Sequence, residues 1–339
     1  MNKINVASYI KSMEPYQGGL PIEEVARKLN IPAQEIVKLA SNENPLGMSP
    51  LAKKAIEKSL SDIERYPDGN GFYLKQAISK KFKIQTSEII LGNGSNDVLE
   101  LVARAFLSEG DEAIYSEHAF AVYSLVVKAV GARGVEVPAV NYAHNLDGFK
   151  KAITNKTKVI FIANPNNPTG TFISKEDIRN FLDYIPSNIV IVLDEAYDEY
   201  LSNDNKSEAF SWLPTYENLI ISRSFSKAYG LAGLRVGFGV GSLEITEIMN
   251  RIRQPFNVNF LAQQAASASL KDDAFIDLSR KINSQGMEQI SEALNNLGIE
   301  YIPSYGNFIS FKLQDENQAM LYYHHLLKKW CYCSSNCEL

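Results

Sequence analysis

Several short polar motifs, far apart in the sequence, together contain the groups that bind and activate an aldehyde cofactor. In chain order they are Gly92-Asn93-Gly94-Ser95-Asn96, Asn167-Pro168-Thr169-Gly170, Asp194-Glu195-Ala196-Tyr197, Ser224-Phe225-Ser226-Lys227 and Arg235. The set offers an amine for a Schiff base, a carboxylate for a protonated ring nitrogen, and hydroxyl, guanidinium and backbone N–H donors for a phosphate. These are the groups of a pyridoxal 5'-phosphate (PLP) site. No single motif of the set would indicate such a site alone.

The groups expected around the cofactor ring follow apolar runs that are typical of buried strands. Asp194 comes directly after the run 189–193, and Asn167 follows the run 159–163. Because ligands of doubly wound sheets bind beyond the carboxyl ends of the strands, Asp194 can pair with the ring nitrogen and keep it protonated. Tyr197 and the Asn167 amide can reach the ring oxygen. Asp194 could instead be a strand-terminating acid that caps the next helix, and the Asn167 segment a rigid Pro/Gly turn.

The lysine lies in a segment that is suited to a phosphate. Ser224, Ser226 and Arg235 surround Lys227 in the sequence. Hydroxyl groups donate to phosphate oxygens, and an arginine offers a two-pronged contact. Residues 92–96 add a glycine-rich turn before a predicted helix, whose free N–H groups favour an anion. Taken alone, Lys227 would be a solvated surface lysine, and residues 92–96 an ordinary helix cap.

Short apolar runs alternate with amphipathic stretches along the chain, which predicts an α/β fold with a mainly parallel sheet. We expect buried strands at 159–163, 189–193, 219–222 and 236–240. A helix is predicted at 175–184, where Ser174 and Asp177 form a capping box, and another at 96–107, which Ser95 can cap. Ser49-Pro50 marks a further helix start.

The composition excludes several classes of protein. At 339 residues the chain suits two domains or one large α/β domain with an appendage. Its net charge of −5 argues against nucleic acid or an anionic membrane as the main partner, and no apolar run approaches the roughly 18 residues of a membrane helix. The N-terminal residues include Lys3 and Lys11 and lack the apolar core of a secretory signal, which predicts a cytoplasmic location. No cysteine precedes Cys331, so the body of the chain has no disulfide framework.

On these motifs the chain resembles fold-type I PLP-dependent aminotransferases, and among them the histidinol-phosphate aminotransferase family. Four further motifs carry the closer resemblance: Glu14-Pro15-Tyr16-Gln17, Ser41-Asn42-Glu43-Asn44-Pro45-Leu46-Gly47, Arg65-Tyr66-Pro67-Asp68-Gly69, and Glu117-His118-Ala119-Phe120 with Tyr123. The resemblance covers nearly the whole chain to about residue 329. It implies a large PLP-binding domain at 46–245, in which helices flank the mainly parallel sheet. A smaller α+β domain at 246–339 and an N-terminal arm at 1–45 would complete the fold.

The resemblance also implies roles for the candidate residues that hold the cofactor. Lys227 would form the Schiff base and then act as the base that moves the proton from the substrate Cα to the cofactor. Asp194 would pair with the ring nitrogen, while Asn167 and Tyr197 would hold the ring oxygen. The other cofactor contacts would be the stacking ring of Phe120 and the phosphate ligands Ser95, Asn96, Ser224, Ser226 and Arg235. Phe120 could also be ordinary core.

Three further roles concern the substrate and a second subunit. Tyr66 resembles the tyrosine that reaches the cofactor phosphate of the partner subunit, which implies a homodimer with shared sites. Tyr16 and Asn42 match positions near the substrate. Without the resemblance, Tyr66 could belong to an aromatic turn, and Tyr16 could be a docking residue for the N-terminal arm.

The implied reaction belongs to histidine biosynthesis. An amino group would pass between L-histidinol phosphate and 2-oxoglutarate in a ping-pong cycle. An aromatic-amino-acid aminotransferase and a PLP-dependent decarboxylase of a phosphorylated amino acid share the same cofactor contacts and stay open as alternatives. A non-catalytic, truncated relic is a further alternative.

The last ten residues, 330–339, depart from the family pattern. They contain Cys331, Cys333 and Cys337, but the spacing lacks a CxxC pair and a fourth ligand for zinc, so no metal site is expected. A frameshift explains the segment better. One choice of codons for residues 330–339, read one base later, encodes Gly-Val-Ile-Val-Arg-Pro-Ile-Ala-Asn-Tyr, a strand and turn of the kind that the family has here. On this hypothesis the chain lacks the arginine for the substrate carboxylate and transaminates poorly.

Overall fold

The computed structural model of the chain describes residues 4–15 and 19–333. Two residues singled out above, Tyr16 and Cys337, lie outside the described residues. Among the described residues, no helix is both long and apolar enough to cross a membrane.

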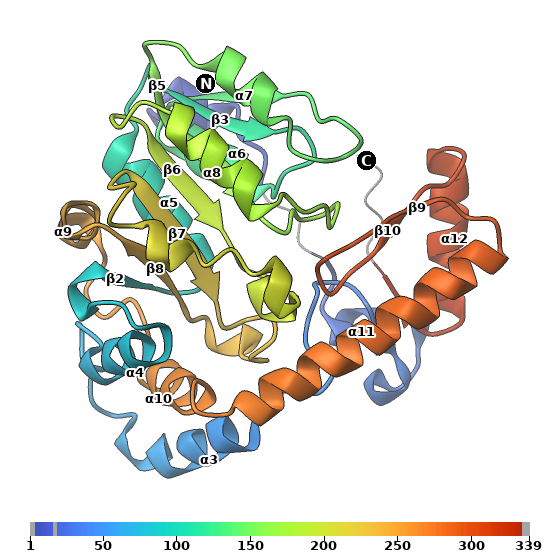
Figure 1. Cartoon of the computed structure of the whole chain (residues 1–339). Helices are drawn as coiled ribbons and strands as arrows, with labels where there is room; N and C mark the ends of the chain where they lie inside the picture. Colours follow the sequence, from blue (N-terminus) through green and yellow to red (C-terminus); the bar gives the residue numbers. More distant parts are fainter. Residues whose placement is uncertain (1–3, 16–18, 334–339) are drawn as a thin grey trace.

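A seven-stranded sheet forms the centre of the described chain (Figure 1). Its strand order is β2-β8-β7-β6-β5-β3-β4. The strands are β2 (Ile89–Gly92), β3 (Glu112–Ser116), β4 (Arg133–Val137), β5 (Thr157–Ala163), β6 (Val190–Asp194), β7 (Leu219–Ser224) and β8 (Gly237–Gly241). Strands β3 to β7 pair in parallel, whereas β8 is antiparallel to both of its neighbours. The sheet is therefore mainly parallel, as predicted, and the four predicted strands correspond to β5, β6, β7 and β8 with ends shifted by one or two residues.

Helices cover both faces of this sheet (Figure 1). The helices are α1 (Ser8–Lys11), α2 (Ile22–Leu29), α3 (Pro50–Ser59), α4 (Phe72–Phe82), α5 (Ser95–Phe106), α6 (Val122–Ala129), α7 (Leu146–Ala152), α8 (Lys175–Tyr184), α9 (Leu243–Ile252), α10 (Phe260–Ser269), α11 (Asp273–Asn296) and α12 (Glu316–Lys328). One core cluster joins α4, α8 and α10 to alternate strand residues such as Ile191 and Leu193. The intervening residues, such as Val190 and Val192, pack with α5, α6 and α9 in a second cluster. This period of two is what a sheet buried on both faces requires.

Two of the helix starts that the sequence predicts are confirmed, and a third is corrected. Helix α8 begins at Lys175 with the Ser174 hydroxyl accepting from the Asp177 N–H at 3.1 Å, and Ser49 caps α3 in the same way. Helix α5 differs, because Ser95 is its first residue and not its cap. The cap is Gly94, at a positive φ of 85°, and a glycine has no side chain with which to cap the first turn. The predicted Ser95 cap is therefore wrong, and the absence of a capping side chain leaves the first N–H groups of α5 free for a ligand.

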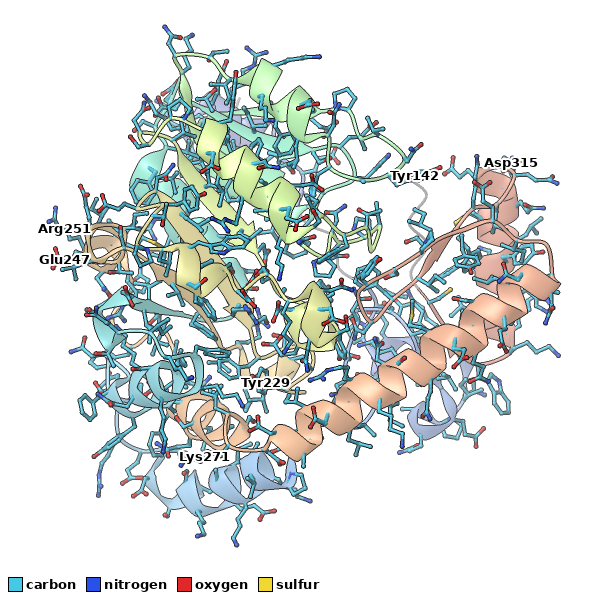
Figure 2. All side chains as sticks on the ribbon, in the orientation of Figure 1. Tyr142, Tyr229, Glu247, Arg251, Lys271 and Asp315 are labelled. Carbon is cyan, nitrogen blue, oxygen red and sulfur yellow. The ribbon has the colours of Figure 1, made fainter. Side chains whose placement is uncertain are left out.

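The rest of the described chain lies to one side of the sheet (Figure 1). The long helix α11 leads from α10 towards α12, and Figure 2 shows Asp315, at the start of α12, at the opposite end of the molecule from Arg251 on α9. Two small sheets lie here, an antiparallel pair of β9 (Tyr301–Ile302) with β10 (Ser310–Phe311) and a parallel pair of β1 (Val37–Lys38) with β11 (Cys331–Tyr332).

The first residues of the unusual C-terminal segment pack into this small unit. Tyr332 is buried in a cluster with Val25, Ala26 and Ile36, and its hydroxyl accepts from the Leu20 N–H at 2.6 Å. Residues 331–332 thus occupy the strand position beside β1, and the Tyr332 side chain contributes to the core of the unit. The expected domain boundaries at 45/46 and 245/246 stay a prediction.

Candidate active site

The residues that the sequence singled out come together at the carboxyl ends of β5, β6 and β7. These three strands are parallel neighbours, so their carboxyl ends share one edge of the sheet. Asp194 is the last residue of β6, Asn167 lies four residues beyond the end of β5, and Lys227 lies three beyond the end of β7. Tyr229, labelled in Figure 2, marks the loop that carries Lys227.

Asp194 is a buried carboxylate at this edge. Its Oδ2 accepts a hydrogen bond of 2.9 Å from the hydroxyl of Tyr123 on α6. Its Oδ1 is also buried and has no hydrogen-bond partner among the described residues. Burial raises the pKa of Asp194 to about 6, against the opposing effects of the Tyr123 hydrogen bond, a backbone N–H and the charge of Lys227. One oxygen of a desolvated carboxylate is therefore free to accept a proton-bearing group.

Tyr197 lies three residues beyond Asp194 and is equally buried. The side-chain N–H of Asn42 donates to its hydroxyl at 3.0 Å, which brings the N-terminal segment into the site. Burial raises the pKa of Tyr197, so its hydroxyl keeps its proton and can act as a donor. Asn167 is half-buried on the neighbouring turn.

The amine of Lys227 lies on the same side as these groups. Its Nζ lies 5.6 Å from the centre of the Tyr197 ring and donates to the carbonyl of Ser41 at 3.0 Å. Desolvation lowers the pKa of Lys227 to about 8, and the positive charge of Arg235 acts in the same direction, whereas the carboxylates of Glu43 and Asp194 oppose the shift. An amine with this pKa is uncharged in an appreciable fraction of molecules near neutral pH, as a nucleophile or base must be.

A cluster of small residues and one arginine lies at the start of α5. The Arg235 guanidinium donates to the Ser226 hydroxyl at 3.3 Å and lies so close to Gly94 that a Cβ there would displace it. The Ser226 N–H in turn donates to the buried hydroxyl of Ser224 at 3.1 Å. A Cβ at residue 237 would likewise meet the N–H of Ser95. Hydroxyl groups, a guanidinium and free helix N–H groups thus converge where a phosphate could lie.

The two aromatic residues of α6 and the turn before it contact each other. Phe120 is half-buried and meets Tyr123 edge to face, with 5.9 Å between ring centres. Tyr123 is fully buried and stacks on Phe161 of β5 at 4.9 Å. This packing fixes the hydroxyl that bonds Asp194.

The structure leaves some of the expected site residues at the surface. Tyr66 is 84% exposed and stacks on Phe256 with 4.9 Å between ring centres. Asn96 is exposed in the first turn of α5. Asn42, by contrast, contacts Tyr197 directly.

Three further residues contribute to the site that sequence reasoning did not assign to it. Tyr123 was noted only as part of a motif, yet it bonds Asp194. The Ser41 carbonyl holds Lys227, and Asn307 donates to the Asn42 carbonyl at 3.0 Å. No local pattern reveals these contacts, because each joins segments far apart in the sequence.

Comparison with known proteins identifies the family. The pattern of the family Aminotransferase class I and II matches residues 34–337. The chain belongs to this family. The match extends beyond residue 329, where the resemblance was expected to end, in agreement with the packing of residues 331–332.

Aminotransferases also account for the most similar proteins. The chain is 56% identical to the histidinol-phosphate aminotransferase of Methylobacillus flagellatus over 95% of this chain and 86% of that protein. It is 51% identical to histidinol-phosphate aminotransferase 2 of Nitrosospira multiformis, over 94% and 82% of the two chains. Its fold matches a crystal structure of histidinol-phosphate aminotransferase from Sinorhizobium meliloti in complex with pyridoxal-5'-phosphate, with a TM-score of 0.90, 24% identity, and coverage of 100% and 91%. The predicted fold class and family are thereby confirmed.

The desolvated state of Asp194 makes a testable prediction for the aminotransferase without cofactor. The pKa of Asp194 is about 6 in the folded chain, against an ordinary value of 3.8, so the ionised carboxylate lowers the free energy of unfolding. This loss of stability is complete above about pH 6 and absent below about pH 4. We expect Asp194→Asn to raise the free energy of unfolding by about 1–3 kcal/mol at pH 8, and the gain to vanish as the pH falls towards 4. Urea unfolding at a series of pH values measures this.

A matched control is Asp147→Asn, which makes the same change of charge at an exposed carboxylate on α7. It should leave stability within about 0.5 kcal/mol of the original chain. A variant Asp194→Asn that is less stable than the original chain at pH 8 would show that Asp194 is not under a desolvation penalty.

Proposed function

We propose that this aminotransferase uses PLP to transfer the amino group of L-histidinol phosphate to 2-oxoglutarate, a step of histidine biosynthesis. The substrate assignment is supported by its relatives from Methylobacillus flagellatus and Nitrosospira multiformis, both named for this activity. The chemistry is supported chiefly by one observation. Asp194 holds a buried oxygen without a partner among the described residues, on the same side of the sheet as the Lys227 amine.

The residues at the strand ends fit the cofactor. The free oxygen of Asp194 suits the protonated ring nitrogen, since a buried carboxylate oxygen without a partner needs a donor. Ser224, Ser226 and Arg235, with the N–H groups at the start of α5, suit the phosphate. PLP, when bound, supplies a ring that accepts the electrons released when a bond to the substrate Cα breaks.

The other site residues orient the reactants and move a proton. With PLP bound, Asp194 would keep a proton on the ring nitrogen, and Tyr197 and Asn167 would donate to the ring oxygen. Phe120 would pack against the ring. Lys227, whose pKa of about 8 leaves part of the amine uncharged, would take the proton from the substrate Cα and deliver it to the cofactor. Asn42 holds the Tyr197 hydroxyl in place and borders the space where the substrate lies.

The assignment predicts a specific covalent attachment and a specific amino donor. Borohydride reduction of the purified protein with PLP should fix the cofactor to the peptide that contains Lys227, and Lys227→Ala should abolish both the attachment and the activity. L-Histidinol phosphate should react with 2-oxoglutarate faster than phenylalanine does, and phosphothreonine should not be decarboxylated. Lys128→Ala, an exposed lysine on α6, is the control and should behave like the original chain. Attachment at another lysine would refute the cofactor site, and a preference for either rival substrate would refute the substrate assignment.

We also propose that two copies of the chain form a homodimer in which Tyr66 contributes to the partner's site. Several large apolar side chains near Tyr66 in the sequence are exposed, as is Phe256, on which Tyr66 stacks; they are Leu60, Ile63, Phe72 and Tyr73. Tyr66 stacks on Phe256, and Phe72 contacts Tyr73, so the side chains form pairs on the surface. Exposed apolar groups of this extent mark protein–protein contacts. A cytoplasmic location, which the composition predicts, completes the proposal.

A shared site predicts that two inactive variants restore each other. We expect Tyr66→Ala and Lys227→Ala to be poorly active alone. After mixing through reversible unfolding, each hybrid dimer would contain one site with both original residues, and activity should return. Static light scattering should give a mass twice that of the chain. If Tyr66 acts in its own subunit, no hybrid site is complete and activity stays low, which would refute the proposal.

A further inference from the structure

A buried ionic cluster, made of Arg223, Glu195, Asp198 and Glu199, adjoins the site at the ends of β6 and β7. Arg223 lies on β7, and all four side chains are buried. The guanidinium contacts Glu195 Oε2 at 2.8 Å, Asp198 Oδ2 at 2.8 Å and Glu199 Oε1 at 3.2 Å. Its carbon lies 5.0 Å from the centre of the Phe210 ring and 5.8 Å from that of Phe82. The cluster therefore holds one cation against three acids in an apolar surround.

A buried ionic cluster of this kind adds little to the free energy of unfolding. The desolvation of buried charges offsets most of their mutual attraction, and apolar residues of the same volume often stabilise a fold as well or better. Burial raises the pKa of Glu195, and the charge of Asp198 adds to the rise, whereas Arg223 and the Ser207 hydrogen bond oppose it. A role in fixing geometry accounts for the cluster better than a role in stability.

The residues of the cluster alternate in sequence with those of the cofactor site. Glu195 directly follows Asp194, Asp198 directly follows Tyr197, and Arg223 directly precedes Ser224. The turn 194–199 is also held by backbone bonds, from the Glu195 N–H to the Ser222 carbonyl at 2.9 Å and from the Asp198 N–H to the Glu195 carbonyl at 3.2 Å. Arg223 thus ties the turn that carries the ring contacts to the strand that leads to the lysine.

We propose that Arg223 is a positioning residue that holds Asp194 and Tyr197, on one strand end, at a fixed place relative to Lys227 on the next. The proposal rests on the proposed function, because it assigns Arg223 to the geometry of the same PLP site. The guanidinium suits this task, since its donors are spread over a rigid planar fork that contacts the three carboxylates in fixed directions, whereas a lysine offers its donors from a single nitrogen on a flexible chain. The cluster also reaches α11, because the Arg280 Nε donates to the Glu199 carbonyl at 3.3 Å.

The test compares Arg223→Lys with a variant that weakens the fold elsewhere. Arg223→Lys keeps the positive charge but loses the three-way contact. The control is Phe181→Leu on α8, a fully buried side chain of the same sheet face that has no part in the cluster. For each variant we would measure the midpoint of urea unfolding, the dissociation constant of PLP, and the pH midpoint of the absorption change of the cofactor attached to Lys227.

We expect Arg223→Lys to weaken PLP binding by about tenfold or more, which corresponds to about 1.4 kcal/mol. The pH midpoint of the absorption change should also rise. In the original chain, the ring-nitrogen proton held by Asp194 and the hydrogen bond donated by Tyr197 both favour the unprotonated form of the Lys227 nitrogen, and Arg223→Lys would weaken both effects. Phe181→Leu should lower the unfolding midpoint without moving either cofactor measurement by more than about twofold. If Arg223→Lys fails to fold, Asp198→Asn keeps the arginine, removes one of its partners, and should move both measurements in the same direction by less.

Two results would overturn the proposal. One is an Arg223→Lys protein that folds and binds PLP with unchanged affinity and an unchanged pH midpoint. The other is a loss of affinity for PLP that is in the same proportion to the loss of stability in Arg223→Lys as in Phe181→Leu. That result would mean that Arg223 has a merely structural role. Failure of the original chain to attach PLP at Lys227 would instead overturn the proposed function itself.

Discussion

The burial of the Asp194 carboxylate at the end of β6 is the constraint on which the site depends. One of its oxygens is bonded by Tyr123, and the other has no partner among the described residues. Water would ordinarily satisfy such an oxygen, and its loss raises the pKa of Asp194 to about 6. The folded chain thus contains a negative charge that desolvation destabilises, and a protonated ring nitrogen would stabilise it. The same desolvation, acting on an amine, lowers the pKa of Lys227 to about 8. A single physical cause therefore prepares both groups for the chemistry of an aminotransferase.

The elements around these two groups serve to hold them in one orientation. Parallel pairing of β5, β6 and β7 brings three loops to one edge of the sheet, and helices on both faces bury the strands that carry them. The Arg223 cluster then links the turn after β6 to β7. The N-terminal segment closes the arrangement through Asn42 and the Ser41 carbonyl, so residues nearly two hundred positions from Lys227 contribute to its surroundings.

Local signals were sufficient to predict several of the elements, and insufficient for contacts between elements. The Ser174 cap predicted the start of α8, and the apolar runs predicted β5 to β8. Asp194 and Lys227 could be singled out because each follows such a run and lies in a distinctive motif. Ser95 was assigned as a cap wrongly, since a glycine at a positive φ can begin a helix without a side-chain bond. The Tyr123 bond to Asp194 joins helix α6 to the end of β6, two elements whose proximity the sequence does not encode locally. The role of Tyr66 depends on a second copy of the chain and stays a prediction.

The most direct test of the account is the rate at which the protein without cofactor captures PLP, measured as a function of pH. Stopped-flow absorbance follows the attachment, with Lys227→Ala as the blank. Because desolvation lowers the pKa of Lys227 to about 8, the rate should rise through a midpoint near pH 8. A rate that rises only near the ordinary lysine pKa of 10.5, or that persists in Lys227→Ala, would contradict the account.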